Sequence, residues 1–404
     1  MNSEINVTAL FEMIKKNNIQ TYDHRKYTLE DIANSIIKSR PRNNSFMMIN
    51  LSSVINMYRI WKKHLPSVKI HYAVKCNPDK LILSTLNYLG TGFDVASQTE
   101  ISLVRSLDIT SDRLIFANAV KDANEINYAM MESVKKMTFD CEDELYKISK
   151  CYPNAELVLR ILVDDSKARL PFGSKFGCRN DKILNLLILA KNLNLNIIGT
   201  SFHVGSGCDD PQSYCSAINK SLDVFNMASN LGFKVYLLDI GGGFPGDLDA
   251  DKFITIANVI NQELDIFRNF YPLLQVIAEP GRFFSTSCGT LCTSIIGKKY
   301  DDYYEKKFQY YVNSSIYGIF NNIIFDKATP IFEVINKKDD STKYPSTIFG
   351  QTCDSMDKIV NEIMLPELSN GDWFIVKNHG AYTNAAASCF NGFGPCDIVY
   401  IFIF

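Results

Sequence analysis

The sequence lacks an excess of either charge, because it has 42 lysine and arginine residues and 44 aspartate and glutamate residues. A net charge of −2 offers no long-range field for nucleic acid or for an anionic membrane, so recognition is expected to be local. Long apolar runs are also missing: residues 183–190 and 398–404 are far shorter than the roughly 20 residues that cross a bilayer. The sequence therefore predicts no nucleic-acid partner and no membrane span.

Signals for export and for metal binding are missing as well. The first residues, MNSEINVTALFEMIKK, lack the basic, apolar and small-residue segments of a secretory signal, so a cytoplasmic protein is expected. Eleven cysteines occur without the C-x-x-C pairs of zinc sites or thioredoxin-type motifs. We therefore expect reduced thiols and no metal.

Two domains are expected, because 404 residues exceed the roughly 250–300 at which one hydrophobic core stops growing. From 47 to about 285, short apolar runs alternate with helix-like stretches, which favours a barrel of parallel strands. The expected strands are 46–50, 69–74, 92–95, 114–116, 137–139, 157–161, 197–203, 235–240 and 274–278, and the expected helices are 80–89, 143–150, 182–192 and 213–231.

The rest of the sequence, after about residue 285, has a different pattern. Its short β-rich runs, among them 310–313, 347–350, 373–377 and 398–404, predict a mostly β second domain. The charged stretches 298–307 and 336–344 are expected to be solvated loops.

Reactive side chains are expected where the parallel strands end, because the strand-to-helix loops of such a barrel gather on that face. Lys75 follows an apolar strand, and burial among apolar neighbours would lower its pKa and make it a nucleophile for an aldehyde cofactor. The alternative is an ordinary solvated lysine. Asp94 ends the next strand, just before Ser97 and Glu100, which fit a helix-capping box.

Further strand ends carry an arginine and a histidine. Arg160 needs an acidic partner if it is buried, and Asp94 and Glu279 are the candidates. His203 could lie flat against an aromatic cofactor ring, with Ser206 donating to a phosphate, or it could be a satisfied core histidine.

Two glycine-containing turns could bind a phosphate group. Gly243 belongs to the run 239–246, where absent side chains let backbone N–H groups surround an anion. In the sequence Glu-Pro-Gly-Arg, Glu279 could pair with a protonated ring nitrogen, and Arg282, after Gly281, could bind phosphate. Each motif could equally be a plain structural turn.

The β-rich part holds three more candidate positions. Cys353 lies beside carboxylates that would raise its pKa, which suits proton donation, although a buried inert cysteine is the alternative. Asp354 follows it, and the pair Phe325 and Asp326 lies upstream. Tyr382 could supply a hydroxyl to a phosphate.

The motifs together, in their order, resemble the eukaryotic-type ornithine decarboxylases, members of the alanine-racemase-like class of pyridoxal-phosphate enzymes. The similarity covers nearly the whole chain and is carried by YAVKCN, FDVAS, MTFD, LVLRI, DDSKARLPFGSKFG, SFHVGSGC, LDIGGGFPG, AEPGR, YVNSSIYGIFN, TCDSMD, LPEL, GDWFIVKNHGAYT and FNGF. It implies a TIM-like α/β barrel of the alanine racemase type at 47–285 that binds pyridoxal 5'-phosphate. Residues 1–46 and 286–404 would form a β-rich, sandwich-like domain that completes the active site across a head-to-tail homodimer.

The resemblance also implies roles for the candidate residues. Lys75 would bind the cofactor aldehyde, His203 would stack on the ring, Glu279 would pair with the ring nitrogen, and Asp94 and Arg160 would support the site. The phosphate positions would be Ser206, Gly243, Gly281, Arg282 and Tyr382. Cys353 would donate a proton and Asp354 would bind substrate, both across the dimer interface, and Asp326, beside Phe325, would bind the distal amine.

The activity implied is decarboxylation of L-ornithine to putrescine and CO2, the first step of polyamine biosynthesis. A lysine or arginine decarboxylase of the same fold remains an alternative, because the sequence does not measure the pocket to one or two atoms. An inactive homologue that binds antizyme, for which relatives use the segment 124–146, is a further one. The sequence departs from the family at Phe283 and Phe325, where tyrosine is common, and at Gln351, where proline is usual.

Overall fold

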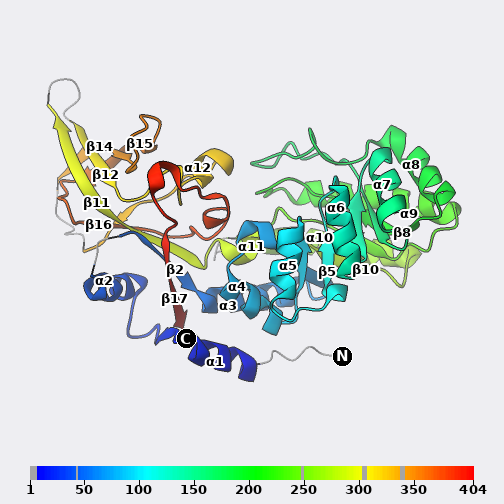
Figure 1. The fold of residues 1–404 in the computed structure, drawn as a ribbon, viewed down its shortest axis with the longest axis horizontal. Helices are drawn as coiled ribbons and strands as arrows, with labels where there is room; N and C mark the ends of the chain where they lie inside the picture. Colours follow the sequence, from blue (N-terminus) through cyan, green and yellow to red (C-terminus); the bar gives the residue numbers. More distant parts are fainter. Residues whose placement is uncertain (1–6, 42–43, 247–249, 303–306, 337–341) are drawn as a thin grey trace. The chain divides into compact units, whose positions relative to one another are not determined.

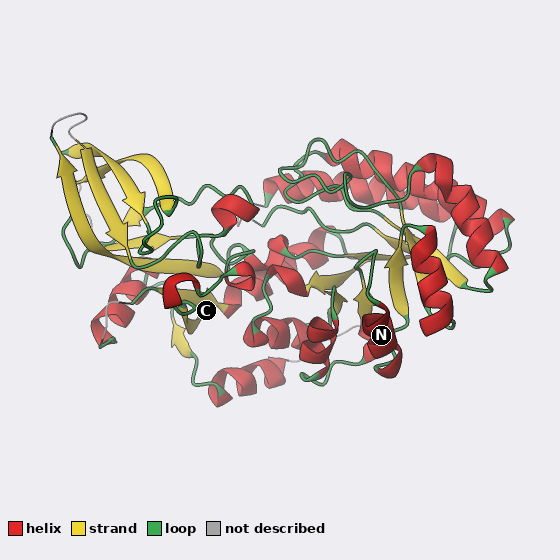
Figure 2. Ribbon diagram, turned by 45° about the horizontal axis from the view of Figure 1, so that its top comes forward, coloured by secondary structure: helices red, strands yellow, loops and turns green. Residues whose placement is uncertain are grey.

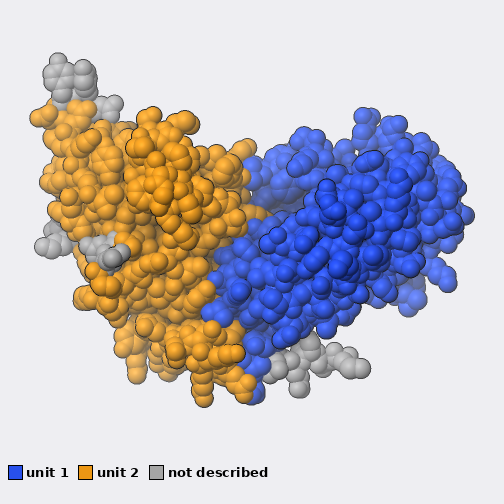
Figure 3. Space-filling model, in the orientation of Figure 1, with its two compact units in different colours: residues 1–10, 55–284 blue, residues 11–54, 285–404 orange. Residues whose placement is uncertain are grey.

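The computed structural model describes residues 7–41, 44–246, 250–302, 307–336 and 342–404. Figure 3 shows their division into two units, one drawn from 1–10 and 55–284 and the other from 11–54 and 285–404. Among the described residues, no helix has both the length and the apolar character needed to cross a membrane. The same part of the chain contains no group of histidine, cysteine or acidic residues placed to hold a metal ion. All eleven cysteines lie within it as free thiols.

The first unit contains a closed barrel of parallel strands, which confirms the predicted α/β barrel (Figure 1). The strands follow one another around the barrel in chain order, and the last pairs with the first. They are β3 (Val68–Ala73), β4 (Gly92–Val95), β5 (Leu114–Phe116), β6 (Lys136–Phe139), β7 (Glu156–Arg160), β8 (Asn196–Ser201), β9 (Leu237–Asp239) and β10 (Gln275–Ala278).

One helix precedes β3 and further helices connect the successive strands, several of them beginning at a residue whose side chain caps the helix. The helices are α3 (Leu51–His64), α4 (Lys80–Tyr88), α5 (Gln98–Arg105), α6 (Ala123–Met131), α7 (Glu142–Cys151), α8 (Asn180–Asn192), α9 (Pro211–Asn230) and α10 (Asp251–Phe270). The Asp79, Asp122 and Asp210 side chains accept backbone N–H bonds at the starts of α4, α6 and α9. Ser97 caps α5 in the same way, so its role as a helix start is confirmed.

The barrel unit buries an aromatic cluster that explains one departure from the family. Phe283 is fully buried, with its ring centroid 4.5 Å from that of Phe253 and 5.2 Å from that of Trp61. Phe244 also contacts Trp61, at 4.9 Å between centroids. Because Phe283 lies among apolar rings, the absence of a hydroxyl there leaves no polar group to satisfy.

The second unit is built on a nine-stranded sheet, whose strands Figure 2 shows in yellow. Its strands are β1 (Gln20–Tyr22), β2 (Phe46–Asn50), β11 (Gly289–Asp301), β12 (Lys307–Val312), β13 (Glu333–Val334), β14 (Lys343–Phe349), β15 (Lys358–Pro366), β16 (Trp373–Val376) and β17 (Asp397–Ile403). Helices α2 (Leu29–Ser39) and α12 (Asn322–Phe325) accompany them, while α1 (Val7–Lys16) and α11 (Arg282–Ser285) each span a boundary between the residue ranges of the two units. The mostly β second domain is therefore confirmed. Ile32 and Ile36 of α2 pack against Phe46, Trp373 and Ile401 of the sheet.

Three sequence expectations were wrong, wholly or in part, in this unit. The run 46–50, expected in the barrel, is β2 and pairs with β11 and β17 of the sheet. Residues 298–301, expected to be a loop, belong to β11, because Lys298 and Lys299 lie over the rings of Phe308 and Tyr311 on the paired strand. Residues 343–344 likewise belong to β14. The remaining parts of these stretches at 303–306 and 337–341 lie outside the described residues.

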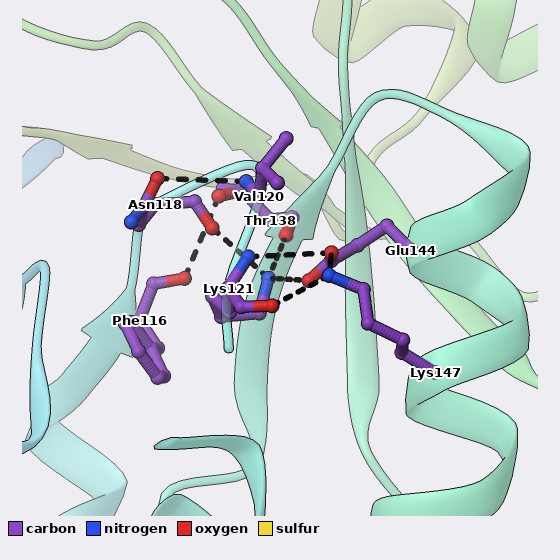
Figure 4. Close-up of polar contacts among 7 residues, drawn as sticks. All are labelled: Phe116, Asn118, Val120, Lys121, Thr138, Glu144 and Lys147. Atoms are coloured by element: carbon purple, nitrogen blue, oxygen red, sulfur yellow. Dashed lines mark hydrogen bonds and ion pairs between the residues drawn. The ribbon is translucent and has the colours of Figure 1, made fainter. Parts of the chain in front are cut away.

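A buried ion pair joins the loop after β5 to α7 (Figure 4). The Lys121 Nζ lies 2.7 Å from Glu144 Oε1, and neither side chain is exposed. The same ammonium donates to the carbonyl oxygens of Thr138 at 2.6 Å and Asn118 at 2.9 Å. Lys147 contacts the other Glu144 oxygen at 2.6 Å. Glu144 thus compensates a lysine that has no access to water.

We expect Glu144→Gln to lower the free energy of unfolding by about 3–5 kcal/mol, because it leaves the Lys121 ammonium buried without its counter-charge. Urea unfolding of the purified variant measures this effect. Glu142→Gln, at an exposed position of α7, is the matched control and should change stability little. Equal stability of the two variants would show that the buried pair contributes nothing.

Candidate active site

Lys75 lies at the carboxyl end of the barrel, in the turn 74–76 that follows β3. Its Nζ pairs with Asp94 on the adjacent strand β4, and the other oxygen of Asp94, Oδ1, is buried and has no hydrogen-bond partner in the part of the chain that the structure describes. The predicted position is confirmed, but the predicted apolar surroundings are wrong. The Lys75 side chain is 41% exposed, and a carboxylate faces its amine. The acidic end of β4 supplies this counter-charge.

Arg160, at the end of β7, is half-buried, and within the described residues no acidic side chain forms a close ion pair with its guanidinium. Its guanidinium carbon lies 4.7 Å from the centroid of the Phe176 ring. Burial lowers the pKa of Arg160, and Glu279 opposes that change more strongly than the other acids do. Of the two partners proposed from the sequence, Glu279 therefore interacts more strongly with Arg160.

His203 follows β8 and has a defined protonation state. Its Nδ1 accepts the backbone N–H of Gly205 at 3.0 Å, and its ring meets the edge of Phe172 with centroids 5.0 Å apart. Burial, with smaller effects from Arg160 and Lys75, lowers the pKa of His203 well below its usual value. The imidazole is therefore neutral, with its hydrogen on Nε2, and a neutral ring suits stacking on an aromatic cofactor.

The turns around Lys75 and His203 are held together by backbone and side-chain contacts. Arg282 donates from Nη2 to Ser206 Oγ at 2.8 Å. Gly243 has a φ of 102°, and a Cβ there would lie 2.6 Å from the carbonyl oxygen of Gly205. A Cβ on Gly281 would lie 2.7 Å from Cys76 Cβ, beside Lys75. Absent side chains are thus required at both glycines, and the arrangement leaves a cradle of the kind that binds phosphate.

A second acid accompanies Glu279 and was missed in the sequence. Asp239 ends β9 and accepts the Gly241 N–H at 2.9 Å, while the Glu279 N–H donates to the Gly241 carbonyl oxygen at 2.7 Å. The two buried carboxyl groups interact, and their shared burial disfavours the ionised form of both. The aspartate just before the predicted glycine run, on the strand next to that of Glu279, was the signal available.

Burial dominates the titration of this pair. It raises the pKa of Asp239 to about 7. Burial, together with the charges of Asp239 and Asp94, raises the pKa of Glu279 well above its ordinary value. Glu279 Oε1 is buried and has no hydrogen-bond partner among the described residues. This oxygen is suited to bind the N–H of a protonated ring nitrogen.

The remaining predicted residues lie on the second unit. Cys353 is exposed, which excludes the alternative of a buried inert thiol. The Asp354 carboxylate accepts the Tyr317 hydroxyl and the Met356 N–H, and these bonds hold its pKa below the usual value. Tyr317 was missed because nothing in the sequence pattern places it next to Asp354.

Other residues of this unit fix the same loop. Asp357, also missed, is buried and accepts the Thr352 hydroxyl at 2.7 Å and the Ile316 N–H at 2.9 Å. The Gln351 N–H donates to the Ser314 carbonyl oxygen at 3.0 Å, a bond that the proline usual in the family could not make.

The substrate and phosphate candidates of this unit differ in exposure. Asp326 is buried at the end of α12, whereas Phe325 before it is 65% exposed. Tyr382 is half-buried and has a φ of 54°.

The barrel residues fit a pyridoxal phosphate group. Lys75 offers an amine, and the unpartnered Oε1 of Glu279 offers an acceptor for the ring nitrogen. Ser206 and Arg282 form a hydroxyl and guanidinium pair for the phosphate, near Gly243 and Gly281, where a Cβ would clash with neighbouring protein atoms.

Comparisons with known proteins agree with this chemistry. Residues 51–286 match the family described as "Pyridoxal-dependent decarboxylase, pyridoxal binding domain". The chain is 44% identical to ornithine decarboxylase of Mus musculus over 93% of this chain and 85% of that protein. It is 43% identical to antizyme inhibitor 2 of Xenopus laevis over 92% and 84%.

A solved structure extends the similarity to the whole fold. The arginine decarboxylase of Paramecium bursaria Chlorella virus, bound to agmatine, is 39% identical with a TM-score of 0.88, and the match covers 92% of this chain and 100% of that chain. The chain therefore belongs to the family of pyridoxal-dependent decarboxylases that includes the eukaryotic ornithine decarboxylases.

Proposed function

We propose that this protein decarboxylates L-ornithine to putrescine and CO2, the first step of polyamine biosynthesis, as a cytoplasmic homodimer with bound pyridoxal 5'-phosphate. The observation that carries the proposal is the placement of Glu279, Lys75 and Asp94 at the ends of the adjacent strands β10, β3 and β4, in that order. This placement supplies an amine for an aldehyde and an acceptor for a ring nitrogen at one rim of the barrel.

The bound cofactor supplies an electron sink for the pair of electrons left at Cα when CO2 departs. Side chains of the barrel would hold the cofactor and control the charge around it. Lys75 would hold the aldehyde, and Glu279 would keep a proton at the ring nitrogen. Arg160, half-buried and charged at neutral pH, would limit the build-up of negative charge from Glu279, Asp239 and Asp94.

The second unit would supply the proton donor and the substrate ligands. The thiol of Cys353, exposed on its own chain, would deliver a proton to Cα in the partner molecule of the dimer. The Asp354 carboxylate, kept ionised by Tyr317 and the Met356 N–H, would bind the distal ammonium together with Asp326. Two carboxylates suit an unbranched ammonium better than a zwitterionic end group such as that of diaminopimelate.

Ornithine can be distinguished from its longer analogues by kinetics. With pyridoxal phosphate added, we expect kcat/KM for ornithine to exceed the values for lysine and arginine by about tenfold or more, since one methylene in a fitted pocket is worth about 10–200-fold. CO2 release from the three amino acids, measured in parallel, tests this expectation. A higher kcat/KM for lysine or arginine would overturn the substrate while leaving the reaction class intact.

Binding of an antizyme by an inactive homologue is a second candidate, supported by the similarity to antizyme inhibitor 2. The relevant segment, 124–146, carries the exposed side chains of Met130, Met131 and Tyr146. Retention of Lys75 and Cys353 argues against an inactive protein, because binding alone does not need them. Antizyme binding without cofactor absorbance or CO2 release would favour this candidate.

A further inference from the structure

Asn391 makes two hydrogen bonds to Cys353, both through its side-chain oxygen. The Cys353 backbone N–H donates to Asn391 Oδ1 at 3.2 Å, and the Cys353 Sγ donates to the same oxygen at 3.4 Å. Both residues belong to the second unit. One amide oxygen thus fixes the cysteine at its backbone and at its thiol.

The turn that carries Asn391 is itself anchored close to the predicted substrate ligand. Phe390 stacks on Tyr317 with ring centroids 4.3 Å apart, and Tyr317 donates its hydroxyl to Asp354. The Ser388 N–H donates to the Tyr317 carbonyl oxygen at 2.8 Å. The segment 388–391 therefore contacts Cys353 directly and is linked to Asp354 through Tyr317.

The backbone at Asn391 adds a second independent observation. Its φ of 56° and ψ of 16° lie in the left-handed region, inside the short helical turn Phe390–Gly392. Most side chains avoid this region, whereas asparagine, aspartate and glycine tolerate it. In this conformation the backbone at Asn391 departs from the helical turn, and the side-chain amide contacts Cys353.

The hydrogen bond selects one protonation state of the sulfur. A thiol can donate to an amide oxygen, but a thiolate has no hydrogen to donate and would face the lone pairs of that oxygen. Asn391 Oδ1 therefore stabilises the protonated form and also sets the direction of the S–H bond. A proton donor requires both.

We propose that Asn391 is a positioning residue, which keeps Cys353 protonated and oriented for proton delivery to the substrate. This inference rests on the proposed function. In the transfer, the S–H bond breaks and a C–H bond forms at the substrate Cα, and the thiolate then recovers a proton from water. Asn391 touches neither substrate nor cofactor in this role and acts through the cysteine.

Two substitutions separate this role from a purely structural one, since both tolerate the left-handed backbone. Asn391→Gly removes the acceptor, and Asn391→Asp keeps an acceptor but adds a negative charge beside the sulfur. The alkylation rate of Cys353 by iodoacetamide is followed against pH in the full-length protein, with the Cys353 peptide quantified by mass spectrometry. Asn378→Gly is the matched control, because Asn378 has a φ of 54° on the same unit. Cys151, on the barrel unit, is the internal reference.

For Asn391→Gly we expect alkylation at neutral pH to be about 2–10-fold faster, with the pH midpoint shifted down, because one neutral hydrogen bond to the thiol is lost. For Asn391→Asp the midpoint should shift up, because the added charge opposes thiolate formation. A midpoint that stays at the wild-type value in both variants, or moves in the same direction in both, would overturn the proposal.

Product analysis gives a second readout. In Asn391→Gly, with cofactor bound, CO2 release from ornithine should persist while the putrescine formed per CO2 falls below one. A ratio that remains one would contradict the role in proton delivery. If the wild-type protein releases no CO2 from ornithine, the proposed function fails, whereas the alkylation midpoints still test the contact between Asn391 and Cys353.

Discussion

Lys75→Ala is expected to abolish the visible absorbance of bound pyridoxal phosphate and to lower CO2 release from ornithine by on the order of a thousandfold or more. The reason is that an amine held at the barrel rim reacts with the aldehyde at an effective concentration that no external amine reaches. Asp94 adds to this effect, because its buried carboxylate fixes the Lys75 Nζ in place. Absorbance titration with the cofactor and a CO2 assay measure the two losses.

Lys80→Ala is the matched control for this variant. Lys80 is an exposed lysine at the first position of α4, five residues after Lys75. Its substitution should leave both the absorbance and the activity close to wild type. A Lys75→Ala protein that keeps the absorbance band would mean that another amine binds the cofactor, and the assignment of the barrel site would be wrong.

Glu279→Gln is expected to lower kcat by on the order of 10²–10³-fold, because a neutral amide does not stabilise the protonated ring nitrogen as a carboxylate does. The loss should appear in kcat more than in KM, since Glu279 acts on the electron sink and not on the amino acid. Steady-state kinetics at saturating cofactor measures it. A variant with unchanged kcat would show that the ring nitrogen has no functional acidic partner at this position.

The same variant has an opposite effect on stability, with a pH dependence that follows from the acid pair. The folded-state pKa of Asp239 is raised from 3.8 to about 7, and that of Glu279 is raised as well. Folded protein then binds more protons than unfolded protein in this window, so the pair reduces stability as pH rises from about 4 to about 7. In thermal unfolding without cofactor, Glu279→Gln should become more stable relative to wild type across this range. A constant difference in Tm would indicate that folding does not raise the pKa of Glu279.

The barrel and its rim were predictable because a few local rules determine them. Parallel strands in such a barrel end on one face, so Lys75, Asp94, His203 and Glu279 could be assigned to it from their places after apolar runs. The glycines were predictable for a similar reason, since a Cβ would clash with the Gly205 backbone at Gly243 and with the Cys76 side chain at Gly281.

What could not be predicted depends on contacts between distant segments. The apolar run 46–50 is compatible with a strand of the barrel and with a strand of the second sheet. Its pairing with β11 and β17 shows that it belongs to the second sheet. The surroundings of Lys75 depend on a carboxylate from the neighbouring strand, so apolar flanking residues gave the wrong environment. The contacts of Asn391 with Cys353 and of Tyr317 with Asp354 likewise join residues far apart in the chain.

The most direct test of the account is the stoichiometry of the reaction. Purified protein supplied with pyridoxal phosphate and L-ornithine should release CO2 and putrescine in a one-to-one ratio, and removal of the cofactor should stop both. Absence of CO2 release from ornithine, lysine and arginine alike, in protein that shows the absorbance of bound cofactor, would contradict the account.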